Sequence, residues 1–157
     1  TFQQANFDAT DRFGDNSDFK YNNRSTPSEG TGPNYDHTYG IGHNGHYFYF
    51  ESSIPTPVGD TILDTPLILL NQASDPNNCA IKFYLHGRGN TAHLHQFRVE
   101  YVKCGDLQNP TTLQTISAGN NPLFPSNTWQ FISAKLPSGL SGNIRFRLVQ
   151  KVRNSCE

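Results

Sequence analysis

The chain has 157 residues and a formal net charge of −1, so we predict one domain, residues 1–157, large enough to bury a sizeable core. The 12 Lys and Arg residues nearly balance the 13 Asp and Glu residues, which argues against nucleic acid or an anionic membrane surface as the main partner. The longest apolar run, Leu67–Leu70, is far shorter than the roughly 20 residues of a transmembrane helix, so we expect no membrane insertion by this segment.

The first distinctive segment is a turn-rich stretch that leads into a run of aromatic residues. Residues 26–34, "TPSEGTGPN", are turn and breaker residues, and the prolines and glycines among them favour a stiff loop over a linker. Asp36 and His37 follow, ahead of the aromatic run 47–50. Because buried polar groups must be paired, we predict that Asp36 and His37 anchor the loop, with Asp36 bound to backbone amides or to a cation. An ordinary solvated loop is the alternative.

Several segments alternate apolar and polar residues, the pattern that is typical of half-buried β-strands. They are residues 46–53, 79–87, 93–104, 128–136 and 143–152. Turn-forming residues separate them, and little in the sequence favours helix. We therefore predict an antiparallel all-β domain closed as a β-sandwich or jelly roll.

The alternation also predicts which side chains face the core. We place inward Ile81, Phe83, Leu85, Phe97, Val99, Tyr101, Ile144, Phe146 and Leu148. We place on the opposite faces Lys82, Tyr84, His86, Gln96, Arg98, Glu100, Arg145 and Arg147. In the segment 128–136 we expect Trp129 and Phe131 to point inward.

Motifs along nearly the whole chain resemble those of one known family. The block "TPSEGTGPNYDHT", followed by "GHYFYFESS", is similar to the signature of MAM domains, the extracellular adhesion modules found in meprin and in receptor phosphatase mu. "NFD" and "DFKY" look like the first strands of that family, and "CAIKFYLHGRG", "WQFISAKL" and "RFRLV" like later ones. The resemblance implies a jelly-roll β-sandwich. It also implies a non-catalytic adhesion or recognition module of a larger secreted or cell-surface protein, which contacts an extracellular partner protein or another copy of itself.

The cysteines depart from the pattern of that family, which carries two disulfide bridges. The early pair is missing here, and the resemblance implies that Cys79 and Cys156 form the late bridge. Cys104 is extra to the pattern. We expect Cys104 to be a buried or half-buried free thiol, and a link to another chain is the alternative.

Acidic residues gather in the N-terminal third, in a chain that is otherwise nearly neutral. Calcium prefers carboxylate and carbonyl oxygens supplied by loops. Jelly rolls related to the resembled family often hold one structural calcium, so the resemblance favours calcium here, and we expect Asp8, Asp18 and Asp36 as its ligands. The alternative is that these residues are solvated turn formers.

Two carbohydrate features are readable from the same region. Jelly rolls with exposed aromatic residues often bind glycans by stacking, and Tyr21, Tyr35 and Tyr39 are the candidates for such a site. Asn23 begins the sequon Asn23–Arg24–Ser25, so it is a candidate glycosylation site in a secreted protein.

A metalloenzyme is the further alternative. His93 and His95 form a His-x-His pair on one strand face, similar to the first metal motif of cupins, which are jelly rolls that hold iron, manganese or zinc. Glu100, the third residue of that motif, lies five residues after His95 and so falls on the opposite face of a regular strand. No second motif follows, so we expect no catalytic activity.

Overall fold

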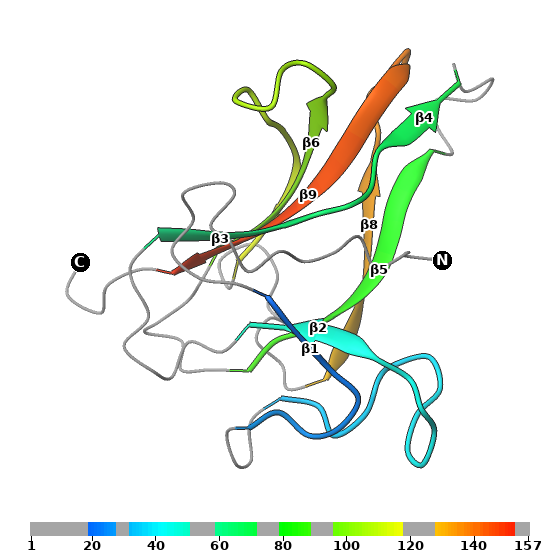
Figure 1. Cartoon of the computed structure of the whole chain (residues 1–157), viewed down its shortest axis with the longest axis vertical. Coiled ribbons are helices and arrows are strands. Elements are labelled where there is room, and N and C mark those ends of the chain that lie inside the picture. Colours follow the sequence, from blue (N-terminus) through cyan, green and yellow to red (C-terminus); the bar gives the residue numbers. More distant parts are fainter. Residues whose placement is uncertain are drawn as a thin grey trace.

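The computed structural model describes residues 19–27, 32–50, 59–71, 79–88, 96–117 and 128–152, and the regular secondary structure there is all β (Figure 1). The strands are β1 (Lys20–Asn22), β2 (Tyr47–Tyr49), β3 (Gly59–Asp64), β4 (Ile68–Leu70), β5 (Ala80–His86), β6 (Gln96–Lys103), β7 (Thr111–Ile116), β8 (Trp129–Lys135) and β9 (Gly142–Val152). Every pairing between them is antiparallel. The predicted antiparallel all-β class is therefore confirmed.

The larger sheet is organised around β9, the longest strand. β6 pairs with one edge of β9 and carries β7 on its far side, while β3 and β4 both pair with the other edge of β9. Between β3 and β4 the amide of Thr65 donates to the carbonyl of Phe146 at 2.9 Å, and the amide of Phe146 donates to the Thr65 hydroxyl at 3.0 Å. The Thr65 hydroxyl thus takes the place of a backbone acceptor for the Phe146 amide, at the residue before Pro66.

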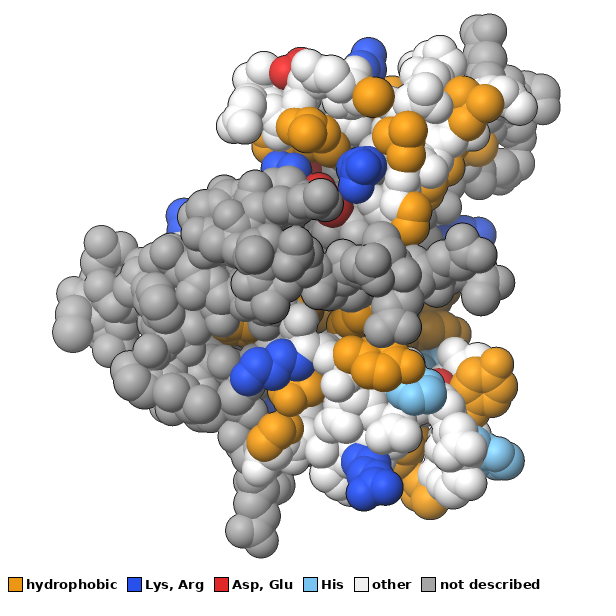
Figure 2. Space-filling model, in the orientation of Figure 1, with side chains coloured by type: hydrophobic (Ala, Val, Ile, Leu, Met, Phe, Trp, Pro, Cys, Tyr) orange, Lys and Arg blue, Asp and Glu red, His pale blue; other side chains and the backbone are white. Residues whose placement is uncertain are grey.

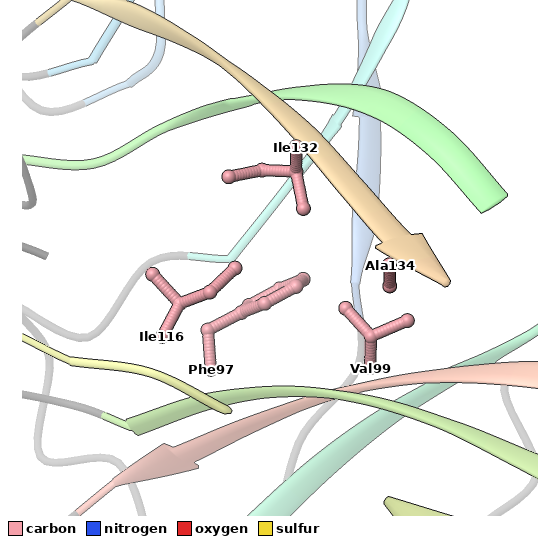
Figure 3. Close-up of a cluster of buried hydrophobic side chains, with 5 residues drawn as sticks. All are labelled: Phe97, Val99, Ile116, Ile132 and Ala134. Carbon is pink, nitrogen blue, oxygen red and sulfur yellow. The ribbon is translucent and has the colours of Figure 1, made fainter. Parts of the chain in front are cut away.

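The two-stranded sheet β5–β8 packs across the larger sheet, so that the core lies between two β layers (Figure 3). In Figure 3 side chains from β8 point toward side chains from β6 and β7. The buried cluster is Phe97, Val99, Ile116, Ile132 and Ala134. Burying each larger side chain of such a cluster contributes about 1.5–3 kcal/mol to stability. A second cluster follows along β6 and β9, with Tyr101, Ile144 and Phe146.

A short hairpin-like pair, β1–β2, completes the described strands at the lower ends of β5 and β8 in Figure 1. Lys20 is opposite Tyr49, and Asn22 is opposite Tyr47. Phe19, just before β1, packs against the first core cluster. This packing ties the hairpin to the sandwich.

Each of the five predicted strand segments contains a strand, but four strands have no counterpart in the pattern analysis. These are β1, β3, β4 and β7, of which only the region of β1 was expected from the family resemblance. β3 reads "GDTILD" and β7 reads "TTLQTI", where threonines and acids obscure the alternation. Both strands are held by pairing with a longer neighbour rather than by a strong local signal.

The predicted inward placement of Phe131 is wrong, and Trp129 shares its outer face but is half-buried there. Phe131 is 57% exposed, whereas Ile132 and Ala134 are buried. The register explains the difference, because Ile132 is opposite Phe83 and therefore shares its inward face. Both faces of this segment carry apolar side chains, so its sequence alone does not show which face is buried.

Glu100 and Arg147 lie on the face opposite the core clusters, as predicted, but both side chains are buried there. Val102 and Val149, on the same face of the larger sheet, are 1% exposed. The face of β6 and β9 that points away from β5–β8 is therefore covered as well. Charges buried there must be paired.

The pairing is supplied by carboxylates of β3 and β6. Arg147 donates from Nε to Asp64 Oδ1 at 3.0 Å and from its terminal nitrogen to Oδ2 at 3.3 Å. Arg98 donates to Asp60 at 2.5 Å and to Glu100 at 2.8 Å. Burial alone would lower the pKa of Arg98, but the bonds to these two carboxylates outweigh it and raise the pKa.

Candidate functional site

The loop before β2 is held by the carboxylate of Asp36. Asp36 is buried, and its Oδ2 accepts hydrogen bonds from the amides of Thr38 at 2.8 Å and Tyr39 at 3.0 Å. Its own carbonyl accepts a bond from the amide of Gly40 at 3.3 Å. An aspartate that bonds backbone amides two and three residues ahead fixes a tight turn, so residues 36–40 have one defined conformation.

The second oxygen of the same carboxylate, Oδ1, is buried and has no hydrogen-bond partner. A buried carboxylate oxygen without a partner costs stability, unless a cation or a water molecule supplies the missing contact. Asp36 can therefore offer one oxygen to a metal ion while Oδ2 holds the turn.

Tyr47, the first residue of β2, fastens the preceding polar stretch. Its hydroxyl has one proton, which the carbonyls of Arg24 and, at 3.2 Å, Pro33 share, and it accepts a bond from Asn22 Nδ2 at 3.4 Å. Burial raises the pKa of the Tyr47 phenol; the bond from Asn22 acts in the opposite direction and nearby Tyr49 adds to the rise. One hydroxyl thus joins two points of the loop that are nine residues apart in sequence.

Asn22 shapes the turn that carries the sequon. Its Nδ2 donates to the carbonyls of Arg24 at 3.1 Å and Ser25 at 2.8 Å, and its Oδ1 accepts from the amides of Asn23 at 2.9 Å and Arg24 at 3.2 Å. Asn23 itself is exposed on this turn. The predicted glycosylation residue is therefore accessible.

His37 contacts the sandwich through its ring. The ring stacks on Tyr84 of β5, with centroids 3.3 Å apart and planes at 11°. Trp129 lies in T-shaped arrangements with His37, His86 and Tyr47, with ring centroids 5.3–6.1 Å apart. The loop thus rests on the outer face of β5–β8, and in Figure 2 the visible histidines lie beside hydrophobic side chains at the lower right.

That outer face exposes two aromatic rings side by side. Tyr84 and Phe131 are opposite each other in the β5–β8 register, and they are 42% and 57% exposed. Their ring centroids lie 5.4 Å apart with planes at 56°. No motif in the sequence marked this surface. The only available signal was that the segment 128–136 carries apolar residues on both of its alternating faces.

The three tyrosines predicted for glycan stacking do not form one platform. Tyr21 is exposed on β1, but its ring stacks on His46 with centroids 4.6 Å apart. Tyr35 and Tyr39 are exposed on the loop, and no ring contact among the described residues joins any two of the three. Ile41, which follows Tyr39 on the same loop, is 78% exposed.

The two cysteines of the described part of the chain, Cys79 and Cys104, form no disulfide with another described residue. Cys79 is half-buried and Cys104 is exposed. The expected burial of Cys104 is wrong: it follows β6 in a turn, where its amide donates to the carbonyl of Asn143 at 2.9 Å. Cys156 lies outside the described residues, so its bridge to Cys79 stays a prediction.

Most of the predicted metal ligands lie outside the described residues. These are Asp8, Asp18, His93 and His95. Within the described ranges no three His, Cys, Asp or Glu side chains gather as they would around a metal ion. Glu100 is described, and its carboxylate is bonded to Arg98 and, at 3.5 Å, to Thr112.

Comparisons with known proteins leave the fold and the site to be interpreted from the structure itself. No family model matches the chain, and no solved structure matches it. In the part of the chain that the structure describes, no helix is long and apolar enough to cross a bilayer.

Proposed function

We propose that the chain is a non-catalytic extracellular recognition module that contacts a partner protein, or another copy of itself, through the tip of the 35–41 loop. The observation that carries the proposal is the exposure of Tyr39 and Ile41, at 66% and 78%, on a loop that Asp36 and Tyr47 hold in place. Exposed apolar side chains on a fixed loop of a β scaffold are typical of binding surfaces.

The physical advantage of such a loop is its low cost of ordering. Tyrosine gives a large contact area with few rotatable bonds, and a loop that is already fixed loses little conformational entropy when it binds. The Asp36 turn and the Tyr47 hydroxyl bonds supply that order before any partner arrives. Tyr39 and Ile41 would be the energetic centre of the contact.

The family resemblance supplies the wider setting of the proposal. It favours closure of the two β layers as a jelly roll, a Cys79–Cys156 bridge, and a place in a larger secreted or cell-surface protein. The exposure of Asn23 is compatible with glycan attachment in such a protein. All these features belong to the same extracellular recognition role.

The test is binding of the labelled chain to an array of extracellular proteins that includes the chain itself. The double variant Tyr39→Ser with Ile41→Ser should lose the partner that the wild-type chain selects, by at least tenfold in Kd, about 1.4 kcal/mol. Leu107→Ser is the matched control, because Leu107 is also an exposed apolar residue but lies on the turn after β6. Unchanged binding by the loop variant, or equal loss by the control, would overturn the proposal.

Calcium is the ion that we propose for the Asp36 region. The unpaired Oδ1 of Asp36 fits one ligand position, and Asp8 and Asp18 would have to supply the remaining carboxylates. An ion there would tie the loop to the N-terminal segment. Calcium at a hundredfold excess over Kd should raise stability by about 2.7 kcal/mol, and Asp36→Asn should remove most of that gain. Equal melting temperatures in calcium and in chelator would contradict it.

The two alternatives have weaker support. Glycan stacking on Tyr21, Tyr35 and Tyr39 would use rings that are spread over two segments, and one face of Tyr21 is covered by His46. A cupin-like metal site at His93 and His95 would need Glu100, whose carboxylate is bonded to Arg98. Elemental analysis of the purified chain distinguishes them, because stoichiometric iron or manganese would favour the enzyme.

A further inference from the structure

The outer face of β5–β8 carries a row of aromatic and basic side chains. The strands place Lys82 opposite Ser133, Tyr84 opposite Phe131, and His86 opposite Trp129, all on the face turned away from the core. At about 3.4 Å per residue, the seven paired positions of β5 span roughly 20 Å. The His37 ring covers one face of Tyr84, so the open part of this surface runs from Phe131 to Lys82 and Lys135, which is long enough for a short run of sugar units.

The charge of this face differs from that of the whole molecule. Lys82 and Lys135 are exposed and lie diagonally across the two strands, roughly 7–8 Å apart at their Cα atoms, and Arg88 is exposed two residues after His86. Neither strand contains an acidic residue, and no carboxylate among the described residues forms an ion pair with these three cations. The face is thus basic in a chain with a net charge of −1.

We propose that the outer face of β5–β8 binds an anionic polysaccharide, with a sugar ring packed on Phe131 and against the part of Tyr84 that His37 leaves exposed, and with its carboxylate or sulfate groups on Lys82 and Lys135. The C–H faces of a sugar ring can pack on an exposed aromatic ring, and its hydroxyls can bond the Ser133 hydroxyl, the Tyr84 phenol and the imidazole of His86. Uncompensated lysines at one end of the row complement the acidic groups. This surface is distinct from the Tyr39–Ile41 tip, so it goes beyond the proposed protein contact.

The size and charge of the face favour a polysaccharide over the two other polyanions. A stable protein interface engages about 20–30 residues on each side, far more than this single row of side chains. Nucleic acid binding draws most of its affinity from many phosphate contacts, and a chain with a net charge of −1 provides few of them. A short row with two rings and a few cations instead matches a flexible sugar chain with scattered acidic groups.

The experiment is calorimetric titration of the full chain with a size-fractionated heparin oligosaccharide at two salt concentrations. Phe131→Ser should weaken binding about tenfold or more, and Phe131→Tyr should retain it because the ring is kept. The double variant Lys82→Gln with Lys135→Gln should also weaken binding and lower the salt dependence of log K by about one per lysine. These residues are exposed, so the variants are expected to fold, which circular dichroism checks.

Matched controls identify the surface and the ligand class. Lys20→Gln with Lys103→Gln removes the same charge from exposed positions outside this face, and it should leave binding unchanged. The same heparin oligosaccharide without sulfate should bind less tightly. No binding of heparin by the wild-type chain, or equal loss in both double lysine variants, overturns the proposal. Tighter binding of poly-dT or polyglutamate than of heparin at equal charge also overturns it, in favour of a nucleic acid or an acidic protein.

Discussion

Gly45 lies directly against the carboxylate of Asp36. A Cβ atom added to Gly45 would be 1.7 Å from Asp36 Oδ1 and 2.1 Å from its Cγ, closer than any non-bonded contact allows. Glycine is therefore required at residue 45 by close approach to a side chain, not by its own backbone conformation. The pair couples the start of the loop to its end, just before β2.

Gly45→Ala should destabilise the protein by about 1–3 kcal/mol, because the new methyl group displaces the carboxylate that holds the turn. In an Asp36→Ala background the same substitution should cost only about 0.5 kcal/mol or less, since the clash is gone. Denaturant unfolding of the four proteins of this cycle measures the coupling. Additive effects would show that Gly45 is needed for another reason.

Tyr47→Phe should cost about 1–2 kcal/mol, because it removes the hydroxyl bonds and leaves the half-buried Pro33 carbonyl without that donor. Trypsin should then cleave faster after Arg24, whose carbonyl the hydroxyl also holds. Tyr39→Phe is the control, because Tyr39 is exposed. Equal cleavage rates in the wild type and Tyr47→Phe would contradict the conclusion that the Tyr47 hydroxyl holds the loop in place.

The same residue predicts a loss of stability in alkali. The folded-state pKa of Tyr47 is raised above its unfolded value near 10, so its contribution is fully present below about pH 10 and is lost as the pH rises through the folded pKa. The free energy of unfolding of the wild type should therefore fall more steeply above about pH 10 than that of Tyr47→Phe. Parallel curves for the two proteins would rule out this linkage.

Ile132→Ala should cost about 2–5 kcal/mol, because Ile132 is buried in the core between the two β layers. Phe131→Ala should cost about 1 kcal/mol or less, although it removes a larger side chain, because Phe131 is more than half exposed. Urea unfolding of both variants tests which face of β8 is buried in the core. The reverse order of costs would mean that Phe131, not Ile132, faces the core.

Asp64→Ala should destabilise the protein by about 3–5 kcal/mol, because it leaves the buried guanidinium of Arg147 without its bidentate partner. Asp60→Ala should cost clearly less, since the Asp60 side chain is 36% exposed and Glu100 still pairs with Arg98. Thermal unfolding at neutral pH gives both values. Similar costs would show that solvent reaches the Arg147–Asp64 pair.

The sequence by itself determined the class of fold and the position of the main strands. Alternating apolar residues predicted β5, β6, β8 and β9, because a side-chain period of two residues is a property of the extended backbone and needs no partner. It also predicted that Asp36 is a buried anchor residue, from its place between a breaker-rich loop and an aromatic strand. The structure gives that residue amide partners.

Only the tertiary structure decided which face of each strand is buried and which residues meet across the chain. In β8 both faces carry apolar side chains, so the pairing of Ile132 with Phe83 was needed to turn Phe131 outward. From sequence alone Glu100 and Arg147 look like solvent-facing residues. In the fold Arg147 pairs with Asp64 of β3, and Arg98 pairs with Glu100 of β6. In the sequence Tyr47 is one aromatic residue among several. In the fold its hydroxyl holds the preceding loop through bonds to carbonyls 14 and 23 residues away. Alternation is a local property of the backbone, whereas burial and pairing depend on neighbours that only folding brings together.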